Sequence, residues 1–192
     1  GAFLTPAIKA RKLDEAHGIE IAFHERTPDA YATQFNAGEF KLGGSAALLT
    51  IGLADRADAV QLWEPAYSTL MAKKPTLRAL DLDMTSQWRT FSGGDKIPYL
   101  GVAAHIEWIE KNRSLIAPLY RTYRQAAQWV AANPAEASKL ILPKGEATDQ
   151  AAIEKLIRDN SRLGMNVQPA AELRKEIEAV YRAGLSIGFL PR

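Results

Sequence analysis

The sequence contains no cysteine, and this absence excludes several chemistries at once. Without a thiol, the chain has no thiolate nucleophile, no sulfur ligand for a metal ion and no disulfide bond. It also has no uninterrupted apolar stretch of about 18 residues, which a membrane-spanning helix needs. The chain has 24 Lys and Arg against 22 Asp and Glu, so its net charge is only +2. The sequence also contains no run of basic residues of the kind that marks a nucleic-acid surface.

The remaining composition is that of an ordinary globular protein. The chain has 192 residues, of which 47% are hydrophobic and 24% are charged. This length allows one domain or two small ones with a substantial core. The first residues, Gly1 to Leu4, are too few and too uncharged to form a secretion signal. The three histidines, His17, His24 and His105, lack the spacing of metal ligands, so the sequence predicts neither a metal nor a cofactor.

Helical and extended patterns alternate through the first half of the chain. We expect helices that begin at Thr5 and Thr27 and span 46–54 and 65–73, and strands over 19–23, 40–42, 59–62, 77–82 and 98–103. Such alternation predicts a mostly parallel sheet flanked by helices. Residues 85–96 are expected to form a loop in which Trp88 and Phe91 either line a cleft or anchor the loop.

The second half of the chain has a helical period throughout. The apolar spacing predicts helices over 106–111, 114–132 and 135–142, one that begins at Thr148 and a last one that begins at Pro169. The buried faces are expected to carry Ile153, Leu156 and Ile157 in the fourth of these, and Leu173, Ile177, Val180 and Tyr181 in the last. This region is therefore predicted to be a helical C-terminal part that packs on the sheet.

The segment from Ala57 to Tyr67 places an aromatic ring and a carboxylate at the end of a predicted strand. Trp63 and Glu64 follow the apolar strand, and Pro65 opens a helix, where its missing N–H is tolerated. In open α/β sheets, ligands bind at the carboxyl ends of the strands. Trp63 and Glu64 are therefore candidate ligand contacts. The alternatives are that Trp63 packs in the core, and that Glu64 caps its own helix or pairs with an arginine.

Three predicted helix starts offer N–H groups to an anion. Ser45 and Ala46 follow a Gly-Gly pair, and Thr5 and Thr27 each precede a proline. Free N–H donors and the helix dipole favour negative charge at such a position. The alternative is that each hydroxyl only caps its own helix. Tyr99, in the last predicted strand, is a further candidate for ligand contact.

Several of these segments together resemble the solute-binding proteins of bacterial ABC importers, in the group that binds nitrate, sulfonates, taurine and thiamine precursors. The matching segments are Thr5-Pro6, Gln34 to Glu39, Gly43 to Ala46, Ala57 to Pro65, and Trp129 to Ala137. The resemblance implies a lobe like that of type II periplasmic binding proteins, with a mostly parallel sheet, flanking helices and a helical C-terminal region.

The resemblance also implies that much of a second lobe is absent. Family members have two α/β lobes, and most of the second would lie between Arg56 and Ala57, which are adjacent here. On the order of 100 residues would thus be either deleted or omitted at this junction. Residues 1–56 would form the N-terminal part of lobe 1, 57–97 a remnant of lobe 2 and hinge, and 98–192 the return strand and C-terminal helices of lobe 1.

The implied function is substrate binding for an ABC importer, without enzymatic activity or a cofactor. The ligand would be a small anionic or zwitterionic organic solute of the sulfonate, nitrate or thiamine-precursor type. The ABC permease would be the membrane partner, and the protein would be periplasmic or lipid-anchored outside the cell. The residues expected to contact the ligand are Thr5, Thr27, Ser45, Ala46, Trp63, Glu64 and Tyr99.

Two other interpretations stay open at this point. One is an enzyme on the same fold, which is disfavoured because the catalytic relatives depend on cysteine-containing motifs and this chain has no cysteine. The other is an isolated lobe that binds no ligand and self-associates through apolar surface that a partner lobe would otherwise cover.

Overall fold

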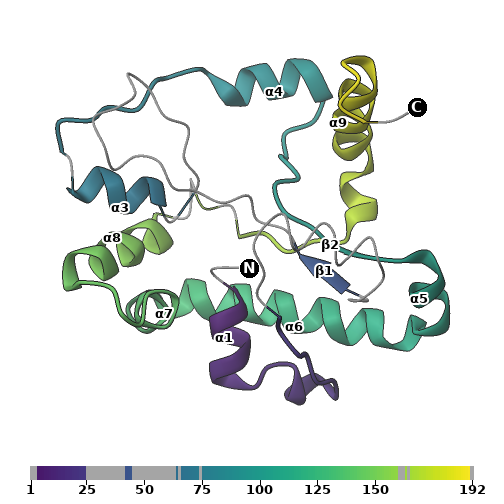
Figure 1. The fold of residues 1–192 in the computed structure, drawn as a ribbon, viewed down its shortest axis with the longest axis horizontal. Helices are drawn as coiled ribbons and strands as arrows, with labels where there is room; N and C mark the ends of the chain where they lie inside the picture. Colours follow the sequence, from purple (N-terminus) through teal and green to yellow (C-terminus); the bar gives the residue numbers. More distant parts are fainter. Residues whose placement is uncertain are drawn as a thin grey trace. The chain divides into compact units, whose positions relative to one another are not determined.

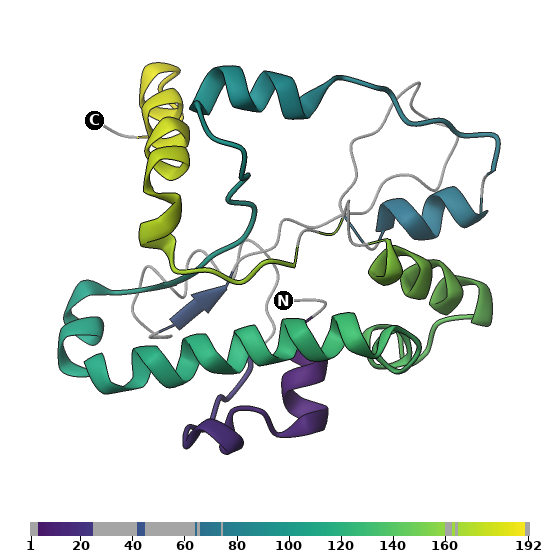
Figure 2. The ribbon, with the colours of Figure 1, turned by 180° about the vertical axis from the view of Figure 1, so that it is seen from behind.

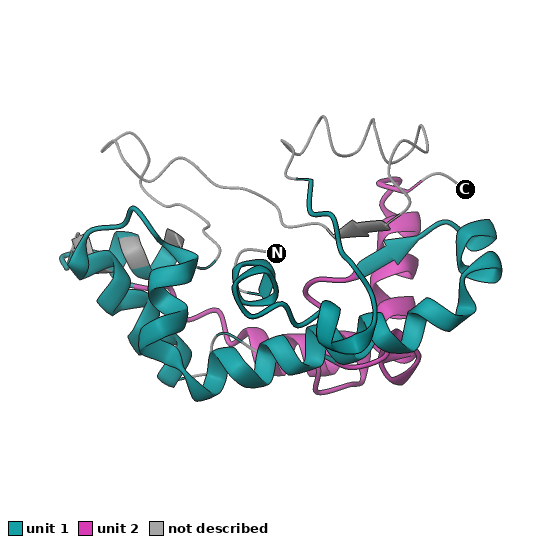
Figure 3. Ribbon diagram, turned by 90° about the horizontal axis from the view of Figure 1, so that it is seen from below, with its two compact units in different colours: residues 1–78, 102–167 teal, residues 79–101, 168–192 magenta. Residues whose placement is uncertain are grey.

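The structure is a computed structural model that describes residues 4–24, 42–44, 64, 66–73, 75–159, 163 and 165–190. The chain divides into two compact units (Figure 3). Unit 1 consists of residues 1–78 and 102–167, and unit 2 consists of residues 79–101 and 168–192.

The core of unit 1 is made by four helices. These are α1 (Leu4–Arg11), α6 (Arg113–Ala132), α7 (Pro134–Ile141) and α8 (Ala147–Arg158). Figure 1 shows α1 lying across the long helix α6, and α7 and α8 continuing from its C-terminal end. The buried apolar cluster comprises Ala7, Ile8, Leu13, Ala126, Val130, Ala137, Ile153 and Ile157.

Helix α6 forms because its sequence repeats with a helical period. Thr122, Ala126 and Val130 follow one another at four-residue spacing and are fully buried, which places them on one face. The Thr122 hydroxyl is satisfied by donating to the Pro118 carbonyl at 3.0 Å. The helix ends at Asn133, whose side-chain amide donates to the Trp129 carbonyl at 2.9 Å, and Pro134 then opens α7.

The chain after α1 turns sharply and does not form the strand predicted over 19–23. Gly18 adopts φ +73° and ends the short 3-10 helix η1 (Glu15–His17), whereas α1 already ends at Arg11, before Lys12 with φ +49°. The N–H groups of Ile19 and Ile21 then donate to the backbone oxygen and the side chain of Asp14, at 3.1 and 2.8 Å. The backbone N–H groups that would pair with a neighbouring strand in a sheet therefore donate to Asp14 instead.

The predicted α/β fold with a mostly parallel sheet is wrong. Among the described residues, strand pairing is limited to β1 (Leu42–Gly44) and β2 (Val102–Ala104), which run antiparallel with Gly43 opposite Ala103. Residues 77–83 form no strand and are exposed, and the predicted loop over 85–96 contains helix α4 (Met84–Ser92). The helix and strand predictions at Thr27, 46–54 and 59–62 lie outside the described residues.

The helical predictions for the second half of unit 1 are confirmed. The structure has α5 (Ile106–Lys111), followed by α6 and α7 within one residue of the predicted bounds. Helix α8 buries Ile153, Leu156 and Ile157, as its spacing predicts, although its N-cap is Glu146 and not Thr148. Helix α3 (Ala66–Lys73) packs on α8.

Unit 2 is built on the packing of α4 against α9 (Arg174–Ser186), which follows the 3-10 helix η2 (Ala170–Leu173) (Figure 2). Gly93 ends α4 with φ +69°, and its carbonyl accepts a hydrogen bond from Lys175 Nζ at 2.6 Å. The side chains buried among its described residues are Ser92, Glu176 and Ala179. Of the four apolar residues predicted for the last helix, Leu173 and Ile177 are half-buried, whereas Val180 and Tyr181 are exposed.

Burial in unit 1 leads to a stability prediction. Ile8 is 0% exposed in the core, whereas Ile106 is 74% exposed. We expect Ile8→Ala to lower the free energy of unfolding by about 2–5 kcal/mol, because it removes buried methyl groups and leaves a cavity. Ile106→Ala is the matched control, with an expected change within about 0.5 kcal/mol. Urea unfolding followed by circular dichroism measures both, and equal effects would contradict the assignment of Ile8 to the core.

A second prediction concerns alkaline pH. Burial raises the pKa of the Tyr123 hydroxyl above its usual value of 10.0. The folded chain therefore keeps this proton at a pH where the unfolded chain has released it, so stability falls as the pH rises above about 10. We expect Tyr123→Phe to reduce this loss, as measured by urea unfolding between pH 9 and pH 11.

Candidate functional site

Of the seven residues expected to contact a ligand, the structure describes Thr5, Glu64 and Tyr99. Thr27, Ser45, Ala46 and Trp63 lie outside the described residues, so their roles stay predictions.

Thr5 does not have the position that the sequence suggested. Helix α1 begins at Leu4, so Thr5 lies inside the first turn and is not the N-cap. Its side chain is half-buried on a helix that packs against α6 and α7. The predicted N-cap at Thr5 is therefore wrong.

Glu64 caps its own helix, which is one of the two alternatives to ligand contact that its position predicts. Its carboxylate Oε2 accepts a hydrogen bond from the Ser68 backbone N–H at 3.1 Å. This bond satisfies one of the N–H groups that have no partner within the first turn of α3. The half-buried carboxylate thereby stabilises the start of a helix that packs on α8.

The three described candidates belong to different surroundings. Thr5 lies on α1, which packs on α6 and α7, whereas Glu64 precedes α3, which packs on α8. Tyr99 belongs to unit 2 and is exposed. The described residues therefore give no support to a single site made of these three.

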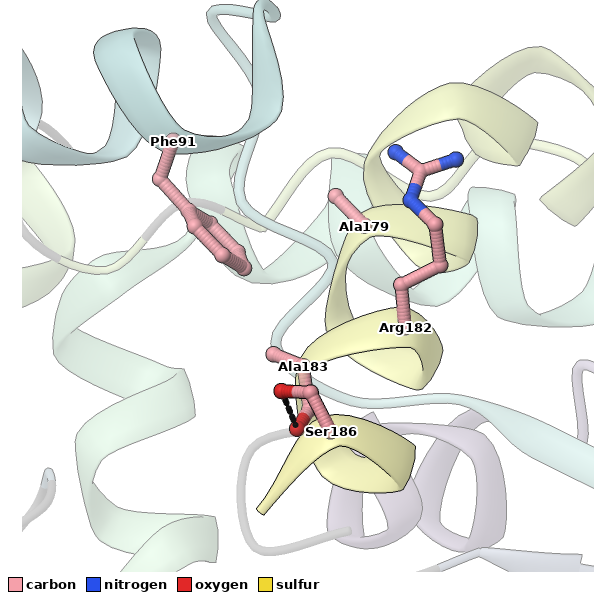
Figure 4. A pocket seen from close by; sticks show the side chains of 5 residues that line it. All are labelled: Phe91, Ala179, Arg182, Ala183 and Ser186. Atoms are coloured by element: carbon pink, nitrogen blue, oxygen red, sulfur yellow. Dashed lines mark hydrogen bonds between the residues drawn. The ribbon is translucent and has the colours of Figure 1, made fainter. Parts of the chain in front are cut away.

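A different set of side chains lines a hollow within unit 2, between α4 and α9. Its volume is about 290 Å³, and it is lined by Phe91, Ala179, Arg182, Ala183 and Ser186. Figure 4 shows the Phe91 ring directed from α4 toward α9, which supplies the other four side chains. Their spacing of three and four residues places them on one side of α9.

The Phe91 ring is held in place by its neighbours on and after α4. Its centroid lies 5.8 Å from that of Trp88, with the two rings tilted by 52°. Trp88 is itself fixed, because its Nε1–H donates to the Lys96 carbonyl at 2.9 Å. An aromatic face is thus presented to the hollow by a short helix with a defined end at Gly93.

Arg182 supplies the charge of this hollow. Among the described residues, it forms no hydrogen bond or ion pair. The nearest acid on the helix, Glu178, has its pKa lowered mainly by a hydrogen bond from Arg174, at 2.7 Å, with a smaller contribution from the charge of Arg182. The same hydrogen bond raises the pKa of Arg174. Because Glu178 is engaged by Arg174, Arg182 has no carboxylate bonded to it among the residues that the structure describes.

The chemistry available in this hollow is binding. The lining combines an aromatic ring, two methyl groups, a guanidinium and a hydroxyl. Ser186 Oγ donates to the Ala183 carbonyl at 2.8 Å, and the lining contains no carboxylate or imidazole that could activate this hydroxyl. An apolar surface next to one positive charge favours an organic anion.

The sequence identified only part of this site. The sequence suggests Phe91 as a cleft residue but predicts a loop over 85–96, whereas Phe91 lies on helix α4. Arg182 was missed because one arginine on an amphipathic helix is ordinarily solvent-exposed. The signal that could have found it is the run of small residues around it, Ala179, Ala183 and Ser186, which leaves room beside the guanidinium.

No protein-family model, curated protein or solved structure matches the chain. Within the described part of the chain, no group of acidic and histidine side chains is arranged to hold a metal ion. None of the helices that the structure describes is long and apolar enough to cross a membrane.

The position of Glu64 leads to a test of its role. We expect Glu64→Ala to lower the free energy of unfolding by about 1 kcal/mol, because the Ser68 N–H loses its acceptor. Glu64→Gln keeps an acceptor oxygen and should lose less. Thermal melting of the three proteins measures the effect. A Glu64→Ala protein of unchanged stability that loses ligand binding would instead make Glu64 a ligand contact.

Proposed function

We propose that the chain is a non-enzymatic binding protein for a small organic anion, of the kind that ABC importers take up. The observation that carries the proposal is the hollow in unit 2, where Phe91 and the guanidinium of Arg182 line the same space. The resemblance to solute-binding proteins of ABC importers supports the same class of ligand.

The lining favours a ligand with a charged head and an apolar part. A sulfonate or carboxylate accepts hydrogen bonds from the guanidinium fork of Arg182, which matches planar and tetrahedral oxyanions. The carbon skeleton would pack on the Phe91 ring and on the methyl groups of Ala179 and Ala183. A volume of about 290 Å³ lies just below the usual range of ligand sites, so we expect a ligand of few atoms.

The charge pattern favours an anion over a zwitterion. A zwitterion also carries an ammonium group, and Glu64, the candidate contact with a carboxylate, accepts a hydrogen bond at the start of α3. The lining of the hollow contains one positive group and no acidic one.

The biological setting follows from the resemblance. We propose that the protein acts in the periplasm or as a lipid-anchored extracellular protein, and that it presents its solute to the permease of an ABC importer. Residues Ser45, Ala46, Trp63 and Thr27 stay predicted contacts in this proposal.

Calorimetric titration with hexanesulfonate, taurine and nitrate tests the proposal. We expect hexanesulfonate to bind most tightly, because only its chain covers the Phe91 ring. Arg182→Gln should weaken hexanesulfonate binding about tenfold by removing a charged hydrogen-bond donor. Phe91→Ala should weaken hexanesulfonate but not nitrate.

Arg113→Gln is the charge-matched control, since Arg113 is an exposed arginine at the start of α6 and does not line the hollow. The proposal fails if no ligand gives heat. It also fails if Arg113→Gln weakens binding as much as Arg182→Gln, because the effect would then be general attraction to positive charge.

A self-associating chain is a second candidate, favoured by the surface of unit 2. Its described residues bury no apolar side chain larger than Ala179. Its exposed large apolar residues are Leu80, Leu82, Met84, Phe91, Ile97, Tyr99, Leu100, Val180, Tyr181, Leu185, Ile187 and Phe189. Such a surface favours association. Light scattering on the calorimetry samples separates the candidates, because a dimer that gives no heat with any anion supports self-association.

A further inference from the structure

A second hollow lies within unit 1, on the side of α6 that faces away from the core. It has a volume of about 430 Å³ and is lined by His17, Arg121, Arg124, Gln125 and Gln128. The four residues of α6 follow one another at spacings of three, one and three, so they form one stripe of the helix. Because Thr122, Ala126 and Val130 are buried, this polar stripe is exposed.

Both arginines of this hollow are available to a ligand. Neither Arg121 nor Arg124 forms a hydrogen bond or ion pair with any residue that the structure describes. The lining contains no carboxylate. The acids next to His17 in the chain are already engaged, since Glu15 pairs with Lys12 at 3.0 Å and Asp14 accepts the Ile21 N–H at 2.8 Å.

The remaining side chains of the hollow are joined across a long sequence separation. His17 Nε2 and Gln125 Oε1 lie 2.7 Å apart, which links η1 to α6. With the imidazole protonated at Nε2, the ring donates to the carboxamide oxygen. The side-chain N–H groups of Gln125 then remain available as donors. Arg124 directly precedes Gln125, and Arg121 lies four residues before it on the same helix.

From this arrangement, we infer that this second hollow, called the α6 hollow below, binds free phosphate or the phosphate group of a small molecule. Two guanidinium groups on neighbouring positions of one helix supply two positive charges and several N–H donors in fixed forks. A phosphate dianion matches this set, because it carries two charges and several acceptor oxygens. The lining has no aliphatic residue and no Phe, Tyr or Trp, so the apolar organic anion proposed for unit 2 meets no ring like that of Phe91 here.

The site differs in kind from that of the proposed function and does not depend on it. One hollow offers an aromatic ring and one guanidinium, and the other offers two guanidinium groups, two carboxamides and an imidazole. Variants at Arg182 should therefore leave phosphate binding unchanged, and variants at Arg121 and Arg124 should leave hexanesulfonate binding unchanged.

Calorimetric titration of the full chain with inorganic phosphate tests the inference. We expect Arg121→Gln and Arg124→Gln each to weaken phosphate binding about tenfold, and the double variant to abolish it. Arg113→Gln, on the same helix but outside the hollow, should bind phosphate as the unchanged protein does. Circular dichroism should show the same helix content for all four proteins, because both arginines of the hollow are exposed.

Two further ligands distinguish the source of the phosphate. Glycerol 3-phosphate is a phosphomonoester dianion, and tighter binding of it than of free phosphate assigns the site to phosphorylated small molecules. The reverse order assigns it to free phosphate. Dimethyl phosphate carries one charge and should bind at least about tenfold more weakly than either.

Three outcomes would overturn the inference. The first is that the unchanged protein gives no heat with phosphate or glycerol 3-phosphate. The second is that Arg113→Gln weakens binding as much as the hollow variants do, which would indicate general charge attraction. The third is that a polyglutamate peptide binds and phosphate does not, which would make the face a docking surface for an acidic protein segment.

Discussion

The burial of one stripe of α6 is the constraint on which unit 1 depends. Thr122, Ala126 and Val130 are fully buried, and α1, α7 and α8 pack with α6 around them. Since a helix has a fixed period, burying this stripe also fixes which side chains face solvent. The exposed Arg121, Arg124, Gln125 and Gln128 are thus held on a rigid element by the same contacts that form the core. A binding surface on such a helix keeps its spacing without a dedicated scaffold.

Unit 2 is held together in a different way. Its helices α4 and α9 meet through the small side chain of Ala179 and through polar groups such as Ser92 and Glu176. Burial of small side chains contributes less to stability than burial of large ones. It also leaves space between the helices, and the hollow beside Phe91 and Arg182 occupies that space. The feature that weakens the packing of unit 2 is therefore the one that makes room for a ligand.

The sequence predicted the parts of the fold that local patterns decide. Helices α5 to α8 follow from apolar spacing and proline, and these signals lie within each segment. The parallel sheet was predicted wrongly because a strand also needs a partner, which periodicity does not supply. At Ile19 and Ile21 the N–H groups bond to Asp14 instead. Glu64 as a helix cap was foreseen as an alternative, whereas Arg121, Arg124 and Arg182 were not identified, because exposed arginines are the rule on amphipathic helices.

The two hollows also differ in how salt should affect them, and this follows from their composition. Contacts between exposed charges weaken as ions screen them, whereas contact with an aromatic face does not. The α6 hollow relies on the charges of Arg121 and Arg124, and the unit 2 hollow shares its contacts between Arg182 and the Phe91 ring. Affinity at the α6 hollow should therefore fall more steeply with ionic strength. At a salt concentration at which the α6 hollow releases phosphate, the unit 2 hollow would therefore still bind an apolar anion.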